Sequence, residues 1–168
     1  MKRFFPIGLI GLGFLLSLGA LSWPYLSKAI DGSASSPVPD QIVGLQKTSY
    51  ISGAEAIAEF ENLHGKQFPI SSGSIGIYGN QQATLWVAGA SSDSVALNMV
   101  ETMEKKIAQG NTPFKPLEQT QLETRTIYSL EGMGQKHYYF QSKNLVIWLA
   151  ANPSVADAAI QQILEVYP

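Results

Sequence analysis

The amino-acid sequence predicts an α+β fold, in which an antiparallel sheet of about five to six strands is built from hairpin-helix units. Three helices are expected mainly on one face of this sheet, and an N-terminal transmembrane helix is expected before it. Three observations lead to this prediction: an uncharged N-terminal run, two hairpin patterns each followed by a helix pattern, and a further helix pattern ahead of them. We divide the 168-residue chain into a membrane anchor (1–28), a flexible linker (29–40) and an extracytoplasmic α+β domain (41–168).

The anchor is predicted from the length of its apolar run and from the charges before it. Lys2 and Arg3 precede the run Phe4–Trp23, which has the roughly 20 residues that a helix needs to cross a bilayer. The positive-inside rule places the N-terminus in the cytoplasm and the rest of the chain outside, as a single-pass signal-anchor. Leu18 occupies a position at which signal peptidase prefers a small residue, so we expect the apolar run to be retained as an anchor. The alternative is cleavage after Gly19, which would release a secreted protein.

The composition beyond the anchor narrows the possible partners. Residues 31–39 read Asp-Gly-Ser-Ala-Ser-Ser-Pro-Val-Pro, a sequence of turn formers and small residues that predicts a linker. All 13 acidic residues lie at or after Asp31, whereas three of the 11 basic residues precede it, so the outer part has a net charge near −5. This acidic balance argues against nucleic acid as a partner. The chain has no cysteine, so packing has to stabilise an exported domain without disulfides.

Three stripes of apolar residues at helical spacing predict three helices in the domain. The first is Gly53–His64, where Ser52 and Glu55 have the spacing of a capping box. The second is about Ser94–Gln109, and it ends before a glycine. The third follows Asn152-Pro153, a cap residue before a first-turn proline, and it closes the chain.

Strands are predicted in the intervals between the helices, mostly as hairpins. Alternating or continuous apolar residues between turn formers are the signal. The predicted strands are Gln41–Tyr50, Ser74–Tyr78, Ala83–Ala88, Thr126–Leu130, Lys136–Phe140 and Leu145–Ala150. The segment 111–116, which holds two prolines, is expected to be a stiff link in which Phe114 fills the core.

Two of these units show a weak internal similarity. Placing Tyr78 over Phe140 aligns Trp86 with Trp148 without a gap, and a capped helix follows each tryptophan. Copies of one hairpin-helix unit are expected to stack so that their apolar faces share a core. The alternative is that the similarity reflects no duplication, because any two hairpin-helix units share this pattern of strands, turn and helix.

The sequence holds no signature of a metal centre, a cofactor or a known catalytic site. Its two histidines, His64 and His137, form neither a His-x-His pair nor a His-Glu-x-x-His helix, so no metal and no cofactor are expected. His64 lies in the last turn of a predicted helix, where an imidazolium favours the helix dipole. We therefore assign no catalytic residue and no metal ligand.

The predicted strand around His137 is the candidate binding groove, formed by His137, Tyr139, Lys136 and Gln135. Strand alternation places His137 and Tyr139 on one face, with Lys136 on the other. In a groove, His137 would be a general acid or base and Tyr139 the phenol that orients it. The competing interpretation, which the aromatic composition favours, is that both are core residues with satisfied polar atoms.

The expected function follows from the anchor and from the absence of a catalytic pattern. We expect a membrane-anchored extracytoplasmic domain that is a non-enzymatic binding or assembly module, with the membrane and a protein as partners. The alternative is a small extracytoplasmic enzyme or ligand-binding protein that uses the groove around His137 and Tyr139.

Overall fold

The computed structural model describes residues 37–64 and 69–168. The predicted transmembrane helix and most of the predicted linker therefore lie outside the described residues. Among the helices of these two ranges, none has the length and hydropathy that a membrane crossing requires.

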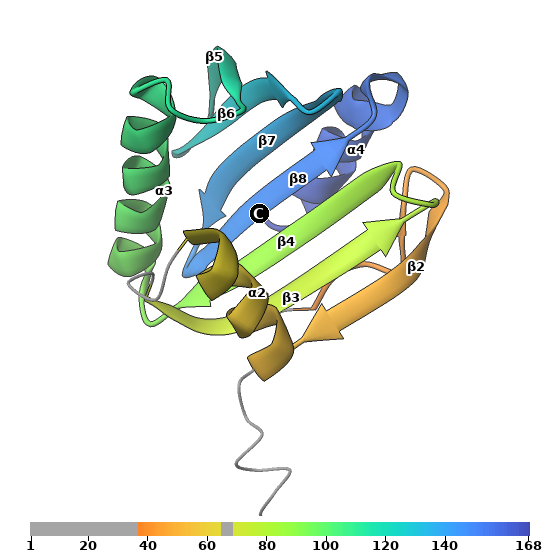
Figure 1. Ribbon diagram of the computed structural model, residues 1–168, viewed down its shortest axis with the longest axis horizontal. Helices are drawn as coiled ribbons and strands as arrows, with labels where there is room; N and C mark the ends of the chain where they lie inside the picture. Colours follow the sequence, from red (N-terminus) through yellow and green to blue (C-terminus); the bar gives the residue numbers. More distant parts are fainter. Residues whose placement is uncertain (1–36, 65–68) are drawn as a thin grey trace, which may run out of the picture. The chain divides into compact units, whose positions relative to one another are not determined.

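The described residues form one antiparallel sheet of eight strands, in the order β1-β2-β3-β4-β8-β7-β6-β5 (Figure 1). The strands are β1 (Gln41–Ile42), β2 (Leu45–Ser52), β3 (Ile70–Tyr78), β4 (Ala83–Ala90), β5 (Lys115–Leu122), β6 (Arg125–Gly132), β7 (Gln135–Ser142) and β8 (Leu145–Ala151). The predicted count of five to six strands was wrong. The predicted first strand is divided by a turn at Val43-Gly44, where both residues have positive φ, and β5 was assigned to no element.

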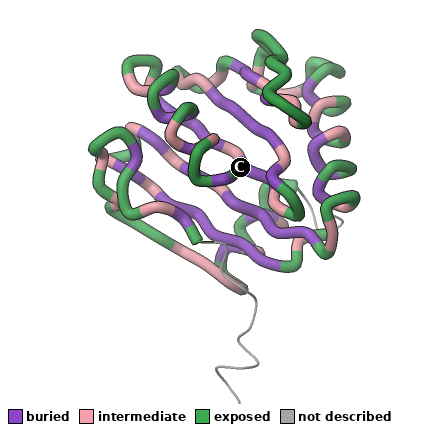
Figure 2. Tube along the Cα trace, turned by 180° about the vertical axis from the view of Figure 1, so that it is seen from behind, coloured by how far each residue is buried: buried purple, intermediate pink, exposed green. Residues whose placement is uncertain are grey.

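Of the three helices in the described residues, two lie on one face of the sheet, and the third lies on the other face. They are α2 (Ala54–His64), α3 (Asp93–Ala108) and α4 (Pro153–Val166). α2 and α3 cover one face, which we call the front face, and α4 covers the other, the back face (Figure 1). Seen from the back, the central strands are mostly buried and the outer sides of the helices are exposed (Figure 2).

The face on which the last residue of the preceding strand lies explains why α3 and α4 cover opposite faces. β4 ends at Ala90, which belongs to the front core, whereas β8 ends at Ala151, which belongs to the back core. Successive residues of a strand point to opposite faces, so the parity of the last strand residue sets the face that the next helix covers. The two predicted hairpin-helix units therefore do not place their helices on a common face, although Trp86 and Trp148 do pair directly across β4 and β8.

Each face has its own core. The back core joins α4 to the sheet around the fully buried Leu85, Phe140 and Leu149. The front core joins α2 and α3 to the sheet through Phe60 and the methionines of α3. α2 approaches β3 closely because Gly73 has no side chain: a Cβ there would lie 2.7 Å from the Phe60 ring.

Arg125 of β6 fastens the C-terminal end of α4. Its guanidinium donates hydrogen bonds to the carbonyl oxygens of Tyr167 and Leu164, the latter at 3.3 Å, and lies 5.3 Å from the centre of the Phe140 ring. The last carbonyls of a helix have no partner within the helix, and a cation at this end also favours the helix dipole.

Arg125→Ala is therefore expected to lower the free energy of unfolding by about 2 kcal/mol, because two helix carbonyls lose charged donors. Urea unfolding of the full chain in a mild detergent measures the change. Lys105→Ala, on the exposed side of α3, is the control and should leave the stability unchanged. Equal stability of the two variants would contradict the assigned role of Arg125.

Candidate functional site

A row of side chains crosses the front face of the sheet from β2 to β6, each paired in register with the next. Its members are Ile51, Ile75, Trp86, Trp148, Tyr139 and Tyr128. The ring centroids of Tyr139 and Trp148 are 5.1 Å apart at an interplanar angle of 11°, and those of Tyr128 and Tyr139 are 4.6 Å apart at 7°. The rings of Trp148, Tyr139 and Tyr128 therefore stack in succession. Together with Trp86 we call them the aromatic row, and its two ends, Trp86 and Tyr128, lie at two different cavities.

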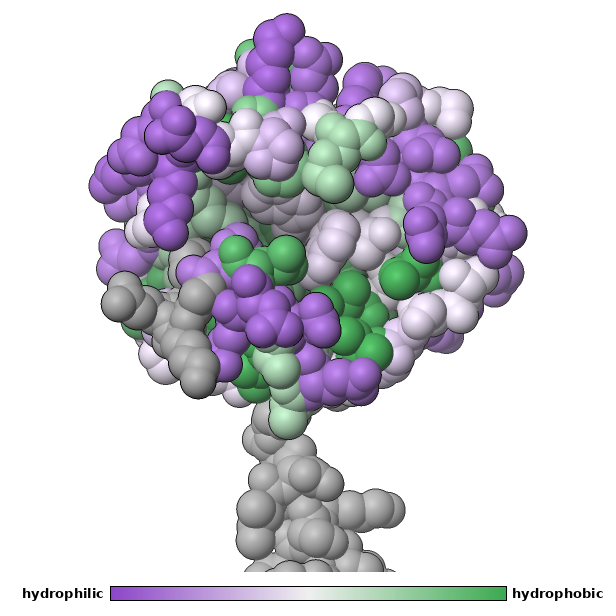
Figure 3. Space-filling view, in the orientation of Figure 1, coloured by the Kyte–Doolittle hydropathy of each residue, from purple (hydrophilic) through white to green (hydrophobic). Residues whose placement is uncertain are grey.

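The larger cavity is an open trough of about 570 Å³ at the Trp86 end of the row. Its floor comes from β2, β3 and β4, α2 forms one wall, and the β6–β7 turn stands at the other side. The lining residues are Ile51, Glu59, Ile75, Ile77, Gln81, Thr84, Trp86, Met133, Gly134, Gln135 and Asn152. Figure 3 shows this face, with hydrophobic surface near its middle bordered by hydrophilic residues.

The polar residues of the trough are almost all uncharged. Glu59 is the one ionisable side chain among the described residues that line it. The Gln135 amide donates hydrogen bonds to the Gln81 carbonyl at 3.3 Å and to the Asn152 side-chain oxygen at 3.4 Å. These bonds tie together three chain segments that are far apart in sequence, and so they give the trough a defined polar rim.

The two tryptophans of the row differ in how their indole N–H groups are used. Trp148 donates its N–H to Nδ1 of His137 at 3.2 Å, so this donor is satisfied inside the protein. Trp86 is half-buried and lines the trough, and its N–H makes no hydrogen bond within the described residues. Trp86 thus offers both an aromatic face and a donor to a ligand in the trough.

Met133 projects beside the trough from a strained turn. Its φ is +54°, in the left-handed region that suits glycine or asparagine, and it is 78% exposed. Gln81, on another side of the trough, also has a positive φ, of +67°. Val43, Glu123 and Lys143, in other turns between strands, also have positive φ, so this conformation belongs to the tight turns of the sheet.

Met133→Asn is expected to raise the free energy of unfolding by about 0.5–1 kcal/mol, because asparagine tolerates the left-handed backbone and Asn-Gly suits this turn. Urea unfolding of the two full chains measures the difference. Thr124→Asn, in the exposed β5–β6 turn at a residue without positive φ, is the control and should change little. A destabilising Met133→Asn would show that the Met133 side chain supports the fold.

His137 is buried in the front core and does not line either cavity. It is 4% exposed, and its ring centroid lies 4.8 Å from that of Phe114 and 5.8 Å from that of Trp148. The Trp148 N–H can only donate, so Nδ1 of His137 accepts, and Nε2 carries the proton and donates to the Gly132 carbonyl at 3.0 Å. Burial lowers the pKa of His137, and the bond to Gly132 offsets part of this shift. Both ring nitrogens are occupied, so none is available to a substrate.

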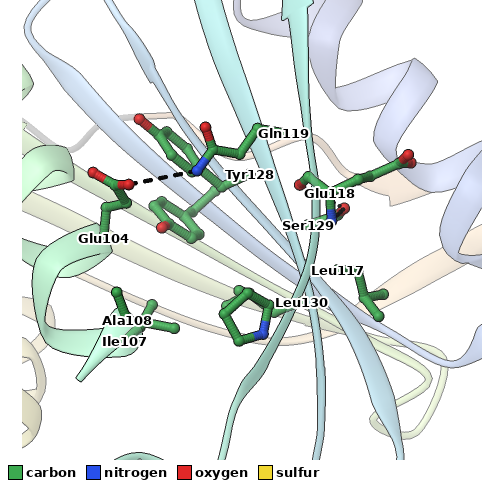
Figure 4. Close-up of a pocket in the computed structure, with 11 residues that line it drawn as sticks. Glu104, Ile107, Ala108, Leu117, Glu118, Gln119, Tyr128, Ser129 and Leu130 are labelled. Carbon is green, nitrogen blue, oxygen red and sulfur yellow. Dashed lines mark hydrogen bonds between the residues drawn. The ribbon is translucent and has the colours of Figure 1, made fainter. Parts of the chain in front are cut away.

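Tyr139 lies beneath the smaller cavity, a recess of about 170 Å³ between α3, β5 and β6. Figure 4 shows the recess, where the side chains of Glu104 and Gln119 meet in a hydrogen bond of 3.5 Å. Burial raises the pKa of Tyr139, and Tyr128 and Glu104 add to the shift. Its phenol therefore keeps its proton, and the recess is too small for a ligand of ordinary size.

Lys136 and Gln135 lie in two further environments. Lys136 is on the back face, where its ammonium pairs with Asp157 of α4 at 2.9 Å, and Tyr138 donates to the same carboxylate at 2.8 Å. Gln135 lines the trough. The structure therefore does not bring the four residues of the predicted groove together, although the alternation of His137 and Tyr139 against Lys136 is as predicted.

Most of the trough could not be predicted from the sequence, because its residues come from six separate parts of the fold. Only Gln135 was among the predicted site residues, and the glycines around Met133 were the one local signal. Within the described ranges, no group of three or more histidine, aspartate and glutamate side chains is placed to hold a metal ion. Comparisons of the chain with protein-family models, curated proteins and solved structures find no match, so the trough has to be interpreted from its own geometry.

Proposed function

We propose that the protein is a membrane-anchored extracytoplasmic binding or assembly module without enzymatic activity, and that it binds its partner in the trough. The observation that carries the proposal is the half-buried Trp86 in an open cavity of about 570 Å³ with an uncharged polar rim. Apolar concavities with a few convergent polar groups are the usual form of binding sites.

The chemistry of the trough supports binding more than catalysis. General acid–base catalysis needs a titratable group within reach of the substrate, and usually a second one that complements it. The trough offers Glu59 alone among the described residues. The histidine of the front core is enclosed by Phe114 and Trp148, so it supplies no such group to the trough.

The first described residues are attached on the face opposite the trough. Tyr78 donates a hydrogen bond to the Pro39 carbonyl at 2.8 Å, and Tyr167 donates one to the Pro37 carbonyl at 2.5 Å. Val38, between the two prolines, belongs to the back core. The described end of the linker therefore leaves the trough uncovered, as a tethered binding module requires.

The test is site-specific photo-crosslinking of the full chain in its native membrane. A photoreactive residue at Met133, beside the trough, should give a discrete adduct that disappears with Trp86→Ala. The control position is Glu165, exposed on α4 at the back face. The same adduct from both positions, or none from Met133, would contradict the proposed use of the trough. Recovery of the chain in the soluble fraction would contradict the anchor.

A further inference from the structure

We infer that the ligand of the trough is a neutral saccharide chain; this inference rests on the proposed function. The first argument is charge. Burying a charged ligand group without a partner costs several kcal/mol, and the described lining supplies one carboxylate and no cation. An anionic ligand would find no counter-charge in the trough, and a polycationic one would find a single partner.

The second argument is the pattern of the lining. Trp86, Ile75 and Ile77 give an apolar floor, because Ile75 and Ile77 are two residues apart on β3 and Trp86 is paired with Ile75, so all three lie on one face of the sheet. Sugar rings present flat C–H faces that stack on an indole, with hydroxyl groups around the ring edge. Both N–H groups of the Gln135 amide are used within the protein, so its oxygen can accept from these hydroxyls and the Asn152 amide N–H groups can donate to them, without any change of charge. An alkyl chain would leave such a polar rim unused.

The third argument separates a saccharide from a peptide strand. An extended peptide usually binds by adding a strand to the free edge of a sheet. The part of the floor under Trp86 lies on inner strands: β3 pairs with β2 and β4, and β4 pairs with β3 and β8. β2 supplies only Ile51, at the margin of the floor. Their backbone groups are already bonded within the sheet, so recognition in the trough relies on side chains. A saccharide satisfies this condition because its own hydrogen-bonding groups are hydroxyls.

The experiment is titration of the full chain, in a mild detergent, with cellohexaose, chitohexaose and maltohexaose, followed by calorimetry. At least one of these neutral hexasaccharides should bind. Trp86→Ala should weaken that binding about tenfold or more, as expected for an aromatic residue at the centre of a site. Trp86→Phe, which keeps an aromatic face, should retain part of the affinity. Trp148→Phe, in the same row but outside the trough, should retain all of it.

Two results would overturn the inference: no binding of any of the three saccharides at millimolar concentration, or equal binding by the wild type and Trp86→Ala. An uncharged, end-blocked serine–threonine–alanine hexapeptide is the competing probe, and its binding in place of the saccharides would also overturn the inference. These results test the saccharide inference and leave the proposed use of the trough to the crosslinking experiment. If no saccharide binds but the Met133 adduct still depends on Trp86, the trough is a binding site for another class of ligand.

Discussion

Tyr139→Ala should lower the free energy of unfolding by about 3–5 kcal/mol, the range measured when large buried side chains are truncated. Tyr139 is 1% exposed, and its ring stacks between Tyr128 and Trp148 in the middle of the aromatic row. Truncation removes two ring contacts and leaves a void beneath α3. A single domain is stable by only about 5–15 kcal/mol, so this variant should be close to unfolding.

Tyr139→Phe separates the ring from the hydroxyl. Tyr139 lines the recess, and its hydroxyl makes no hydrogen bond within the described residues, so the phenylalanine variant should lie within about 1 kcal/mol of the wild type. Urea unfolding of the full chain, followed by tryptophan fluorescence and circular dichroism, gives both values. A phenylalanine variant as unstable as the alanine variant would show that the hydroxyl, rather than the packing of the ring, stabilises the front core.

The helices were predictable from the sequence because their signals are local. Ser92 caps α3 by accepting a hydrogen bond from the Val95 N–H, whereas Asn152 precedes α4 without a side-chain capping bond. Each observed helix begins within two residues of its predicted start. At α2 the capping box was predicted at Ser52. The residue that begins the helix is Gly53, whose carbonyl accepts the first helical hydrogen bond, from the Ile57 N–H. The periodicity of apolar residues identified the buried side of each helix.

β5 was missed because its residues carry none of the usual strand signals. Lys115–Leu122 is exposed along its whole length, so no alternation of apolar and polar residues marks it, and it contains Pro116. Its register with β6 also shifts between Pro116 and Gln119. A proline and a bulge are features that protect a sheet edge from pairing with other chains, and they suit its place at the end of the sheet.

The candidate site was harder to predict than the fold, because it depends on which strands become neighbours. Trp86 lies in one strand and Gln135 in another, and the strand order β4-β8-β7 places β8 between them. Nothing local in the sequence specifies that order. His137 drew attention as a titratable group in an aromatic strand, but only the register that places it opposite Leu130 and Ala150 shows that it is buried.

Acidification should destabilise the fold through His137. Burial holds the pKa of His137 below its usual value of about 6.5 in the folded protein. Between the lowered folded pKa and the pKa of the unfolded chain, the unfolded state binds more protons, so stability falls as the pH decreases from about 6.5. Above that pH, neither state is protonated and His137 contributes no pH dependence. The loss is at most about 1.4 kcal/mol per pH unit for one proton.

The hydrogen bonds give the physical cause of this sensitivity. A proton on Nδ1 of His137 would face the Trp148 N–H, so two donors would point at each other across 3.2 Å. His137→Gln should therefore flatten the stability profile below about pH 6.5. His64, whose pKa burial and Lys106 also lower, is the second group in this window, and His64→Gln isolates its share. If the free energy of unfolding depends on pH equally in the wild type and in His137→Gln, the His137 ring takes up its proton in the folded state. The bond to Trp148 would then not hold the imidazole neutral.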